Sequence, residues 1–321
     1  MLVQSPRFVL GVALLLACCI EPSLAADPQA VAEAAPTVVA WPWWVWALLL
    51  FVVTFLMGIV AVLGGVGGGV LFVPIVGGFF PFHLDFVRGA GLLVALAGAL
   101  AAGPGLLRSG MANMRLAMPL ALIASASAIG GAMMGLALPA NVVQTALGVT
   151  ILGIVVLMWS AKKSEFPEVP QADALSSALR ITGIYHDAAS NKDINWRVHR
   201  TPMGLALFVV IGIMAGMFGL GAGWANVPVL NLLMGAPLKV SVATSKFMLS
   251  IVDTSAAWVY LNQGAVLAII AVPSIVGIML GSLVGVRLLK KANASVVRKV
   301  VIIMLTLAGS RALLKGLGIW T

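Results

Sequence analysis

The stretch Gly64 to Pro74, which reads GGVGGGVLFVP, places five glycines in six residues. It interrupts a long apolar run at a point where a membrane-spanning helix would otherwise continue. Glycine costs a helix interior about 1 kcal/mol relative to alanine, so the cluster is predicted to break the helix. Broken backbone at membrane depth is tolerated only where protein buries it or where it lines a wet cavity. We therefore expect this break to be enclosed by the rest of the protein.

The composition is that of an integral membrane protein. Of the 321 residues, 61% are hydrophobic and 9% are charged, and the mean hydropathy is +1.11. Soluble domains carry about 25% charged residues. The 19 Lys and Arg outnumber the 10 Asp and Glu, which in a chain this apolar indicates basic cytoplasmic loops and not nucleic-acid binding. The predicted fold class is all-α, a polytopic membrane protein.

The N-terminus has the features of an export signal. Arg7 precedes a short apolar run, and the small-residue sequence PSLAAD follows it, so residues 1–25 are predicted to be a cleaved signal peptide. A lipoprotein signal ending at Cys18 and an uncleaved anchor are the alternatives. Cys18 and Cys19 are the only cysteines, so the membrane domain has no disulfide framework and no thiolate metal site. Residues 26–41 form an N-terminal linker.

The rest of the chain divides into two membrane halves. We predict a first membrane repeat at 42–160, a cytoplasmic linker at 161–202 and a second membrane repeat at 203–321. The linker is either a small folded insert or a solvated tether, and its polar composition favours the tether. The expected apolar segments are 42–63, 70–80, 86–107, 116–137 and 141–159 in the first half, and 203–219, 224–234, 240–261, 265–286 and 297–314 in the second.

The two halves are duplicates. GVGGGVLFVP at Gly65–Pro74 aligns with GLGAGWANVP at Gly219–Pro228 at a shift of 154 residues, and three of the glycines, the valine and the proline coincide. In both halves, a short apolar segment directly follows the glycine cluster. The same shift aligns further pairs downstream: Gly110 with Gly264, Pro119 with Pro273, and Gly131 with Gly285.

Basic residues predict that the repeats are inverted. With five membrane segments per half and the N-terminus outside, the linker and the turns at Arg108–Arg115 and 290–299 all fall in the cytoplasm, where basic residues concentrate. Four segments per half would place the basic linker outside. The linker contributes Lys162, Lys163, Arg180, Lys192, Arg197 and Arg200. Tryptophans at the start of the first segment fit an interfacial belt, namely Trp41, Trp43, Trp44 and Trp46.

Inverted-repeat transporters hold their substrate near the midplane, where broken helices of the two halves meet. Free N–H groups at the start of each short helix, together with the helix dipole, favour an anion there. Glycine lets the backbone approach the ligand closely. Close helix packing through small residues is the alternative explanation. The predicted substrate-binding residues in the two motifs are Gly67, Gly68, Gly69, Gly221, Ala222 and Gly223.

The chain resembles the TauE/SafE family of sulfite and organosulfur anion exporters. The paired glycine motifs, NLLMGAPLKVSVATSKFMLS at Asn231–Ser250, GIMLGSLVGVRLL further on and GIYHD in the linker carry the resemblance. It implies an inner-membrane permease for small sulfur-containing anions. Relatives usually have Gly where Ala222 stands, and often have Lys and Asn where Asn226 and Lys246 stand. We include Asn226 among the expected substrate-binding residues.

One helix of the second half carries the ionisable candidates. Asp253 falls in mid-segment, where a charged group is expensive and functional by default, and we expect it to carry a coupling proton. Lys246, two turns earlier on the same face, is expected to attract the anion, unless it extends to the cytoplasmic edge. Thr244 and Ser245 offer hydroxyls to an oxyanion, unless these bond only to their own helix. Asp85, beside His83 and Arg88, is expected to be structural.

We therefore expect a secondary transporter of small anions, with proton coupling, in the inner membrane. A passive anion channel is the alternative. An enzyme is not expected: the membrane segments contain no Glu, while His186 and His199 lie in the linker, so the paired groups of a membrane phosphatase or protease are missing. We expect no cofactor or metal. The expected partners are a small anionic substrate and membrane lipid, no nucleic acid is expected, and a homo-oligomer remains open.

Overall fold

The fold is taken from a computed structural model of the chain. It describes residues 42–64, 67–108, 112–160, 169, 171–187, 192–288 and 294–319. The expected signal peptide and the N-terminal linker lie outside the described residues. Within them the chain is helical except for one β-hairpin in the linker. This confirms the all-α prediction.

Each repeat contains five helical segments. In the first repeat they are α3 (Trp43–Gly64), α4 (Gly68–Phe79), α5 (Leu84–Arg108), α6 (Met114–Ala137) and α7 (Ala140–Ser160). In the second repeat they are α9 (Thr201–Phe218), α10 (Gly223–Pro228) continuing as the π-helical turn η3 (Val229–Leu233), α11 (Leu238–Asn262), α12 (Ala268–Leu288) and α13 (Ala294–Gly316). Six of these helices are long and apolar enough to cross a membrane, namely α3, α5, α6, α7, α9 and α12.

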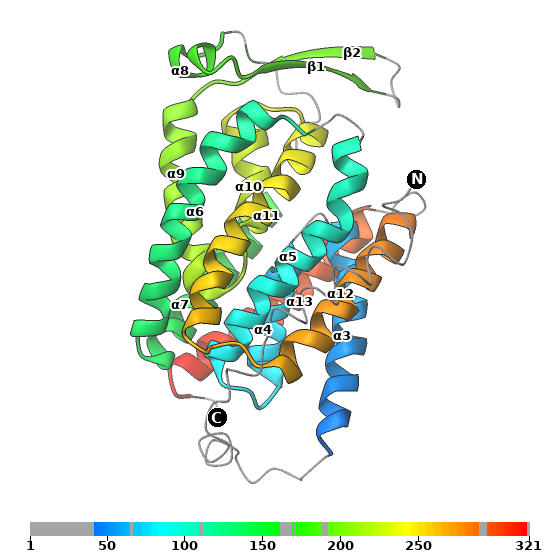
Figure 1. Cartoon of the computed structure of the whole chain (residues 1–321), viewed down its shortest axis with the longest axis vertical. Helices are drawn as coiled ribbons and strands as arrows, with labels where there is room; N and C mark the ends of the chain where they lie inside the picture. The colour runs from blue at the N-terminus through cyan, green and yellow to red at the C-terminus, as the bar shows by residue number, and fades with distance from the viewer. Residues whose placement is uncertain are drawn as a thin grey trace.

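The helix boundaries show the duplication directly. The first and last residues of α11, Leu238 and Asn262, lie 154 positions after those of α5, Leu84 and Arg108. Contacts between helices follow the same correspondence, since α3 packs against α12 and their counterparts α9 and α6 pack against each other. Helix α3 begins at the end of the molecule far from the hairpin, whereas α9 begins beside the hairpin and runs the opposite way (Figure 1). The two repeats are therefore inverted.

Small residues bring the two long helix pairs into close contact. A Cβ on Gly281 of α12 would lie 2.0 Å from the carbonyl oxygen of Phe55 in α3, and a Cβ on Gly216 of α9 would lie 2.0 Å from that of Ala128 in α6. Without a hydrophobic force between helices in lipid, such backbone approach is a main source of association. Close backbone contact at a glycine therefore holds both symmetry-related helix pairs together, α3 with α12 and α9 with α6.

The tryptophans predicted to form an interfacial belt differ in exposure, and Trp41 lies outside the described residues. Trp43 and Trp44 are exposed, as an interfacial belt requires. Trp46 is partly buried, and its ring lies 6.0 Å from that of Phe80 and 5.9 Å from that of Phe82. Its side chain therefore ties α3 to the segment that follows α4.

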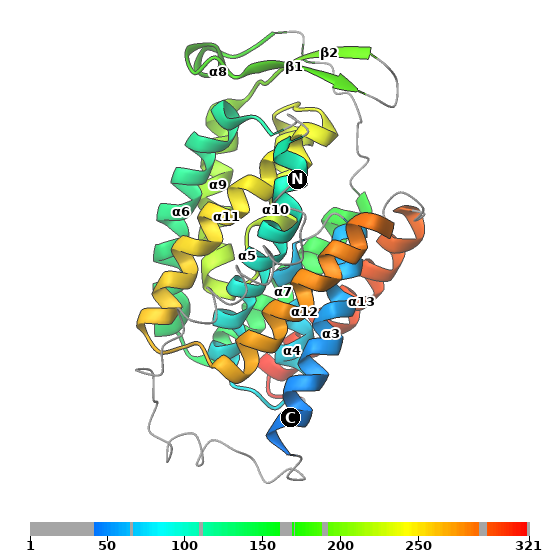
Figure 2. The same cartoon turned by 45° about the vertical axis from the view of Figure 1, so that its right-hand side comes forward.

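The linker is a folded insert, so the preference for a tether was wrong. It contains α8 (Ala174–Ala178) and the antiparallel strands β1 (Thr182–Asp187) and β2 (Lys192–Arg197). Figure 2 shows these elements together at one end of the helical body, above α6 and α9. Trp196 is buried within this insert, and Ile194 is partly buried.

Asp173 fastens the insert to the membrane domain. Its carboxylate accepts hydrogen bonds from the backbone N–H of Ser176, which caps α8, and from both the N–H (3.1 Å) and the hydroxyl (2.9 Å) of Thr201 at the start of α9. Burial raises the pKa of the Asp173 carboxyl, but the hydrogen bonds from Ser176 and Thr201 outweigh burial and hold the pKa below its ordinary value.

Candidate functional site

The two broken helices meet inside the protein. Helix α3 ends at Gly64 and α4 begins at Gly68, whereas α9 ends at Phe218 and α10 begins at Gly223. A Cβ on Gly223 would lie 3.1 Å from the Cα and 3.2 Å from the N of Gly67. The structure therefore brings predicted residues of both motifs into backbone contact, although they are 156 positions apart (67 and 223).

Two glycines in the second motif are required by backbone conformation. Gly219 and Gly221 have φ angles of +68° and +69°, in the left-handed region that favours glycine. In the first motif the limits are steric: a Cβ on Gly69 would lie 2.5 Å from the carbonyl oxygen of Leu220, and one on Gly68 would lie 3.2 Å from the side chain of Ile278. Of the predicted glycines, Gly68 and Gly69 therefore pack against protein.

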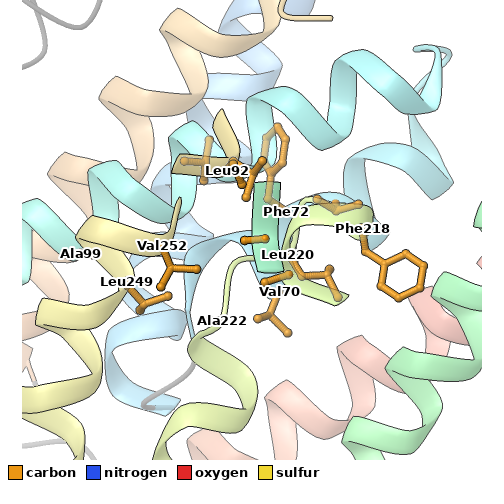
Figure 3. Close-up of a cluster of buried hydrophobic side chains, with 14 of the residues drawn as sticks. Val70, Phe72, Leu92, Ala99, Phe218, Leu220, Ala222, Leu249 and Val252 are labelled. Carbon is orange, nitrogen blue, oxygen red and sulfur yellow. The ribbon is translucent and has the colours of Figure 1, made fainter. Parts of the chain in front are cut away.

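Apolar side chains surround this meeting point. Figure 3 shows Leu249 and Val252 of α11 on one side of the segment that leads into α10 (residues 219–222) and Phe218 on the other side. Ala222 lies among them and is fully buried. Such surroundings weaken dielectric screening, so any charge or unpaired polar group here interacts strongly with its neighbours.

Asn226 is the polar side chain best placed to meet a ligand. It is fully buried, and neither its Nδ2 nor its Oδ1 has a hydrogen-bond partner within the part of the chain that the structure describes. It is three positions after Gly223, so both lie on the same face of α10, and Gly223 faces Gly67. A buried amide without partners costs about 1–3 kcal/mol. This cost is removed if a ligand bonds to the amide.

Asp253 lies beside the same break. Its carboxylate is fully buried and has no partner of normal hydrogen-bond geometry among the described residues. A Cβ on Gly221 would lie 2.9 Å from Oδ2 and 3.0 Å from Oδ1, and the backbone N–H of Ala222 faces the carboxylate. The predicted coupling residue therefore touches the predicted substrate-binding backbone.

The remaining predicted residues of α11 have different surroundings. Lys246 is partly buried and lies two turns before Asp253 on the same helix. The Thr244 hydroxyl accepts a hydrogen bond of 3.2 Å from the backbone N–H of Asn113, which caps α6, so this hydroxyl holds two helices together. Ser245 is buried. The Ser250 hydroxyl donates to the carbonyl of Phe247 in its own helix.

A comparison with protein families identifies the chain. The model of the sulfite exporter TauE/SafE family matches residues 49–312, which contain both glycine motifs and Asp253. The chain belongs to the TauE/SafE family. It is a multi-pass membrane transporter.

Two relatives of this TauE/SafE chain carry transporter names. It is 28% identical over 119 residues to the probable membrane transporter protein YunE of Bacillus subtilis, a match that covers 37% of this chain and 44% of YunE. It is 26% identical over 257 residues to the probable membrane transporter protein ORF9 of a Sinorhizobium species, over 79% of this chain and 87% of ORF9. The chain thus matches less than half of YunE and most of ORF9. No solved structure matches the chain.

Sequence reasoning did not find the role of Arg88 in this TauE/SafE chain. Arg88 is fully buried, and its guanidinium donates to the carbonyls of Gly135 (3.0 Å) and Met217 (2.9 Å), near the last turns of α6 and α9. It also pairs with Asp85 and lies 5.8 Å from the ring of Tyr260. The only sequence signal was its spacing of three residues from Asp85. Arg88 joins four helices, so Asp85 has the structural role expected of it.

A metal centre finds no support in the described residues. Within them, no three His, Cys, Asp or Glu side chains lie close enough to hold a metal ion. The polar groups that the structure places at the meeting point include backbone N–H groups, the Asn226 amide and the Asp253 carboxylate, and Lys246 lies two turns before Asp253 on α11.

Proposed function

We propose that the protein is a secondary transporter that carries small anions, sulfite or organosulfonate-like compounds, across the inner membrane with proton coupling. The observation that carries this proposal is the contact between Gly67 and Gly223, where broken helices of inverted repeats meet beside the amide of Asn226, which has no hydrogen-bond partner among the described residues. Transporters of this architecture bind substrate at such a point.

The groups around the contact suit an oxyanion. Backbone N–H groups next to Gly67 and Gly223 are donors at the positive ends of α4 and of the α10–η3 segment. The Asn226 side chain can donate two hydrogen bonds through Nδ2. Lys246 supplies the positive charge on the cytoplasmic side of Asp253. The family description supports sulfite-like compounds, whose oxygens accept several hydrogen bonds at once.

Asp253 favours a carrier over a passive channel. A channel needs only a pathway with weak binding sites, whereas a buried carboxylate beside the substrate-binding backbone provides a group whose charge changes with proton uptake. A carrier coupled to protons accumulates substrate when a pH gradient is imposed. A channel equilibrates the anion with or without that gradient, apart from the effect of membrane potential.

Uptake into inside-out membrane vesicles tests the proposal. We expect uptake of one or more of sulfite, thiosulfate, sulfoacetate and sulfate, and a change in final accumulation when a pH gradient is imposed at zero membrane potential. Vesicles with Gly221→Val serve as the matched negative control. Flux of an anion with no response to the pH gradient would support a channel. Absence of flux for the whole panel in both vesicle orientations would contradict the proposed substrate class.

A further inference from the structure

The carboxylate of Asp253 occupies the position where the proposed substrate site needs an anion. Both oxygens lie within 3.0 Å of the position that a Cβ on Gly221 would take, and the Ala222 N–H faces them. The side chain is fully buried. An acidic group thus lies against the same backbone that is expected to hold the transported anion.

We infer that Asp253 acts as an internal substitute for the substrate. In the empty site its carboxylate lies against the backbone of Gly221 and Ala222. A singly charged oxyanion takes that place only after Asp253 has taken up a proton. This inference rests on the proposed function. It specifies the charge of the substrate and the direction in which proton and anion move relative to each other.

Charge balance gives the first argument. Lys246 and Asp253 are the two ionisable side chains in the middle of α11, two helical turns apart, so a charged Lys246 and a charged Asp253 balance each other in the empty site. An anion that entered beside the charged carboxylate would leave one negative charge uncompensated among apolar groups such as Leu249 and Val252, which is costly in a weakly screening environment. Protonation of Asp253 removes this excess. A singly charged anion then restores neutrality, whereas a doubly charged anion does not.

No other charged group of the packed helices takes over this role. Among the described residues of α9 and α10 there is no charged side chain. Asp85 and Arg88 of α5 lie near Tyr260, which is seven residues or about 10 Å further along α11. Apart from Lys246 and Asp253 themselves, the remaining charged residues of α5, α6 and α11 lie within the first or last turn of their helices, namely Arg108, Arg115 and Lys239.

Steric fit gives the second argument. Gly221 has no side chain, and its φ of +69° turns the backbone towards Asp253. Protonation removes the attraction between the carboxylate and the Ala222 N–H, so the carboxyl can turn away and free that N–H for the anion. One proton is taken up for each anion bound and is released with it, and no other bond changes. Proton and anion therefore cross the membrane in the same direction.

Binding of methanesulfonate to the purified full-length protein tests the inference. Methanesulfonate is the anion of a strong acid and stays singly charged throughout the working pH range, so any pH dependence arises from the protein. We expect its Kd to rise about tenfold per pH unit at the alkaline end of the range. For Asp253→Asn, we expect tight binding that does not depend on pH. Sulfate should bind at least about tenfold more weakly than methanesulfonate to both proteins, a difference of about 1.4 kcal/mol.

Proton uptake by the wild-type protein provides a second test that needs no variant. With a pH indicator in weakly buffered detergent solution, methanesulfonate should cause uptake of about one proton per bound anion at the alkaline end. In proteoliposomes, an inward proton gradient should drive methanesulfonate accumulation by the wild type, and Asp253→Asn should only equilibrate it.

The possible outcomes distinguish a failure of the inference about Asp253 from a failure of the proposed anion transport. Binding of methanesulfonate without proton uptake, or accumulation driven by a proton gradient of the opposite direction, would overturn the inference and leave anion transport intact. If wild-type protein binds neither methanesulfonate nor sulfite, both the inference and the proposed function are wrong. Equal pH dependence in the wild type and in Asp253→Asn would assign the titration to another group.

Discussion

Gly67 and Gly223 are in backbone contact at the centre of the protein, with the position of a Gly223 Cβ only 3.1 Å from the Cα of Gly67. The first belongs to one repeat and the second to the other, so the contact exists only because the repeats are inverted and packed together. It brings the starts of α4 and α10 to one point. We expect transport to require that this point remain free of side chains.

Substitutions of Gly67 should show how large a side chain the contact tolerates before transport is lost. A Cβ on Gly67 would meet Gly223 at 3.5 Å, an ordinary contact, and the φ of Gly67 is −67°. We therefore expect Gly67→Ala to transport at close to the wild-type rate and Gly67→Val to lose at least about tenfold in transport, or about 1.4 kcal/mol. Gly153→Val is the control, since a Cβ there would meet no atom of the described residues within 4 Å. Normal transport by Gly67→Val would show that the contact only packs the helices.

Replacing Asn226 should lower anion uptake without lowering the stability of the protein. Asn226→Leu removes a buried amide that has no partner within the described part of the chain, so we expect thermal stability in detergent to stay equal or to rise, while anion uptake falls at least about tenfold. Asn231→Leu is the matched control, because the Asn231 amide donates to the carbonyl of Ala236 at 2.8 Å. Its loss should destabilise the protein by about 1 kcal/mol. A strongly destabilised Asn226→Leu protein would mean that the amide has a structural partner.

Arg88 should be essential for stability. Arg88→Met leaves the carbonyls of Gly135 and Met217 without their donor and removes the ion pair between Arg88 and Asp85, and breaking such a buried network costs about 3–5 kcal/mol. We expect a large loss of folded protein in detergent-extracted membranes. Arg88→Lys should rescue little, because an ammonium group cannot reproduce the planar fork of a guanidinium. Arg115→Gln, at an exposed position of α6, should leave the yield unchanged, and equal losses for Arg115→Gln and Arg88→Met would refute the special role of Arg88.

The Asp173 contact should hold the linker insert in place. Asp173→Ala removes the cap of α8 and both bonds to Thr201, so limited proteolysis should cut the insert faster, in line with a lost cap worth about 1 kcal/mol. Asp173→Asn keeps an acceptor at the cap and should show a smaller effect. Because the pKa of Asp173 is lowered from 3.8, its contribution is fully present above that value and is lost as the pH falls through the lower folded pKa. Wild-type cleavage should therefore not change between about pH 5 and 8 on account of Asp173.

Membrane topology is open to direct measurement. In protein with Cys18 and Cys19 replaced by serine, a cysteine at the exposed Asn262 should react with a membrane-impermeant reagent in intact cells, and one at the exposed Ser177 should not. Both should react after permeabilisation. Ser177 is preferred to its neighbour Ser176, which is buried and bonds to Val198. Equal labelling of both sites in intact cells would contradict the predicted cytoplasmic linker.

The sequence alone was sufficient for the membrane class, the duplication and most segment boundaries. Apolar composition and the constant shift of 154 residues are local or repeated signals, and α5 and α11 start and end at positions that obey that shift. Basic residues in the loops predicted the inversion because they report on the side of the membrane and not on packing.

Only the tertiary structure decided which residues meet. The contact between Gly67 and Gly223, the approach of Asp253 to Gly221 and the four-helix network of Arg88 all join residues far apart in the chain. No periodicity or composition encodes such contacts, because they depend on how two complete repeats pack against each other. The hairpin in the linker escaped prediction for a related reason: its stability comes from the buried Trp196 and the Asp173 bonds to Thr201, whereas its polar composition resembles that of a solvated chain.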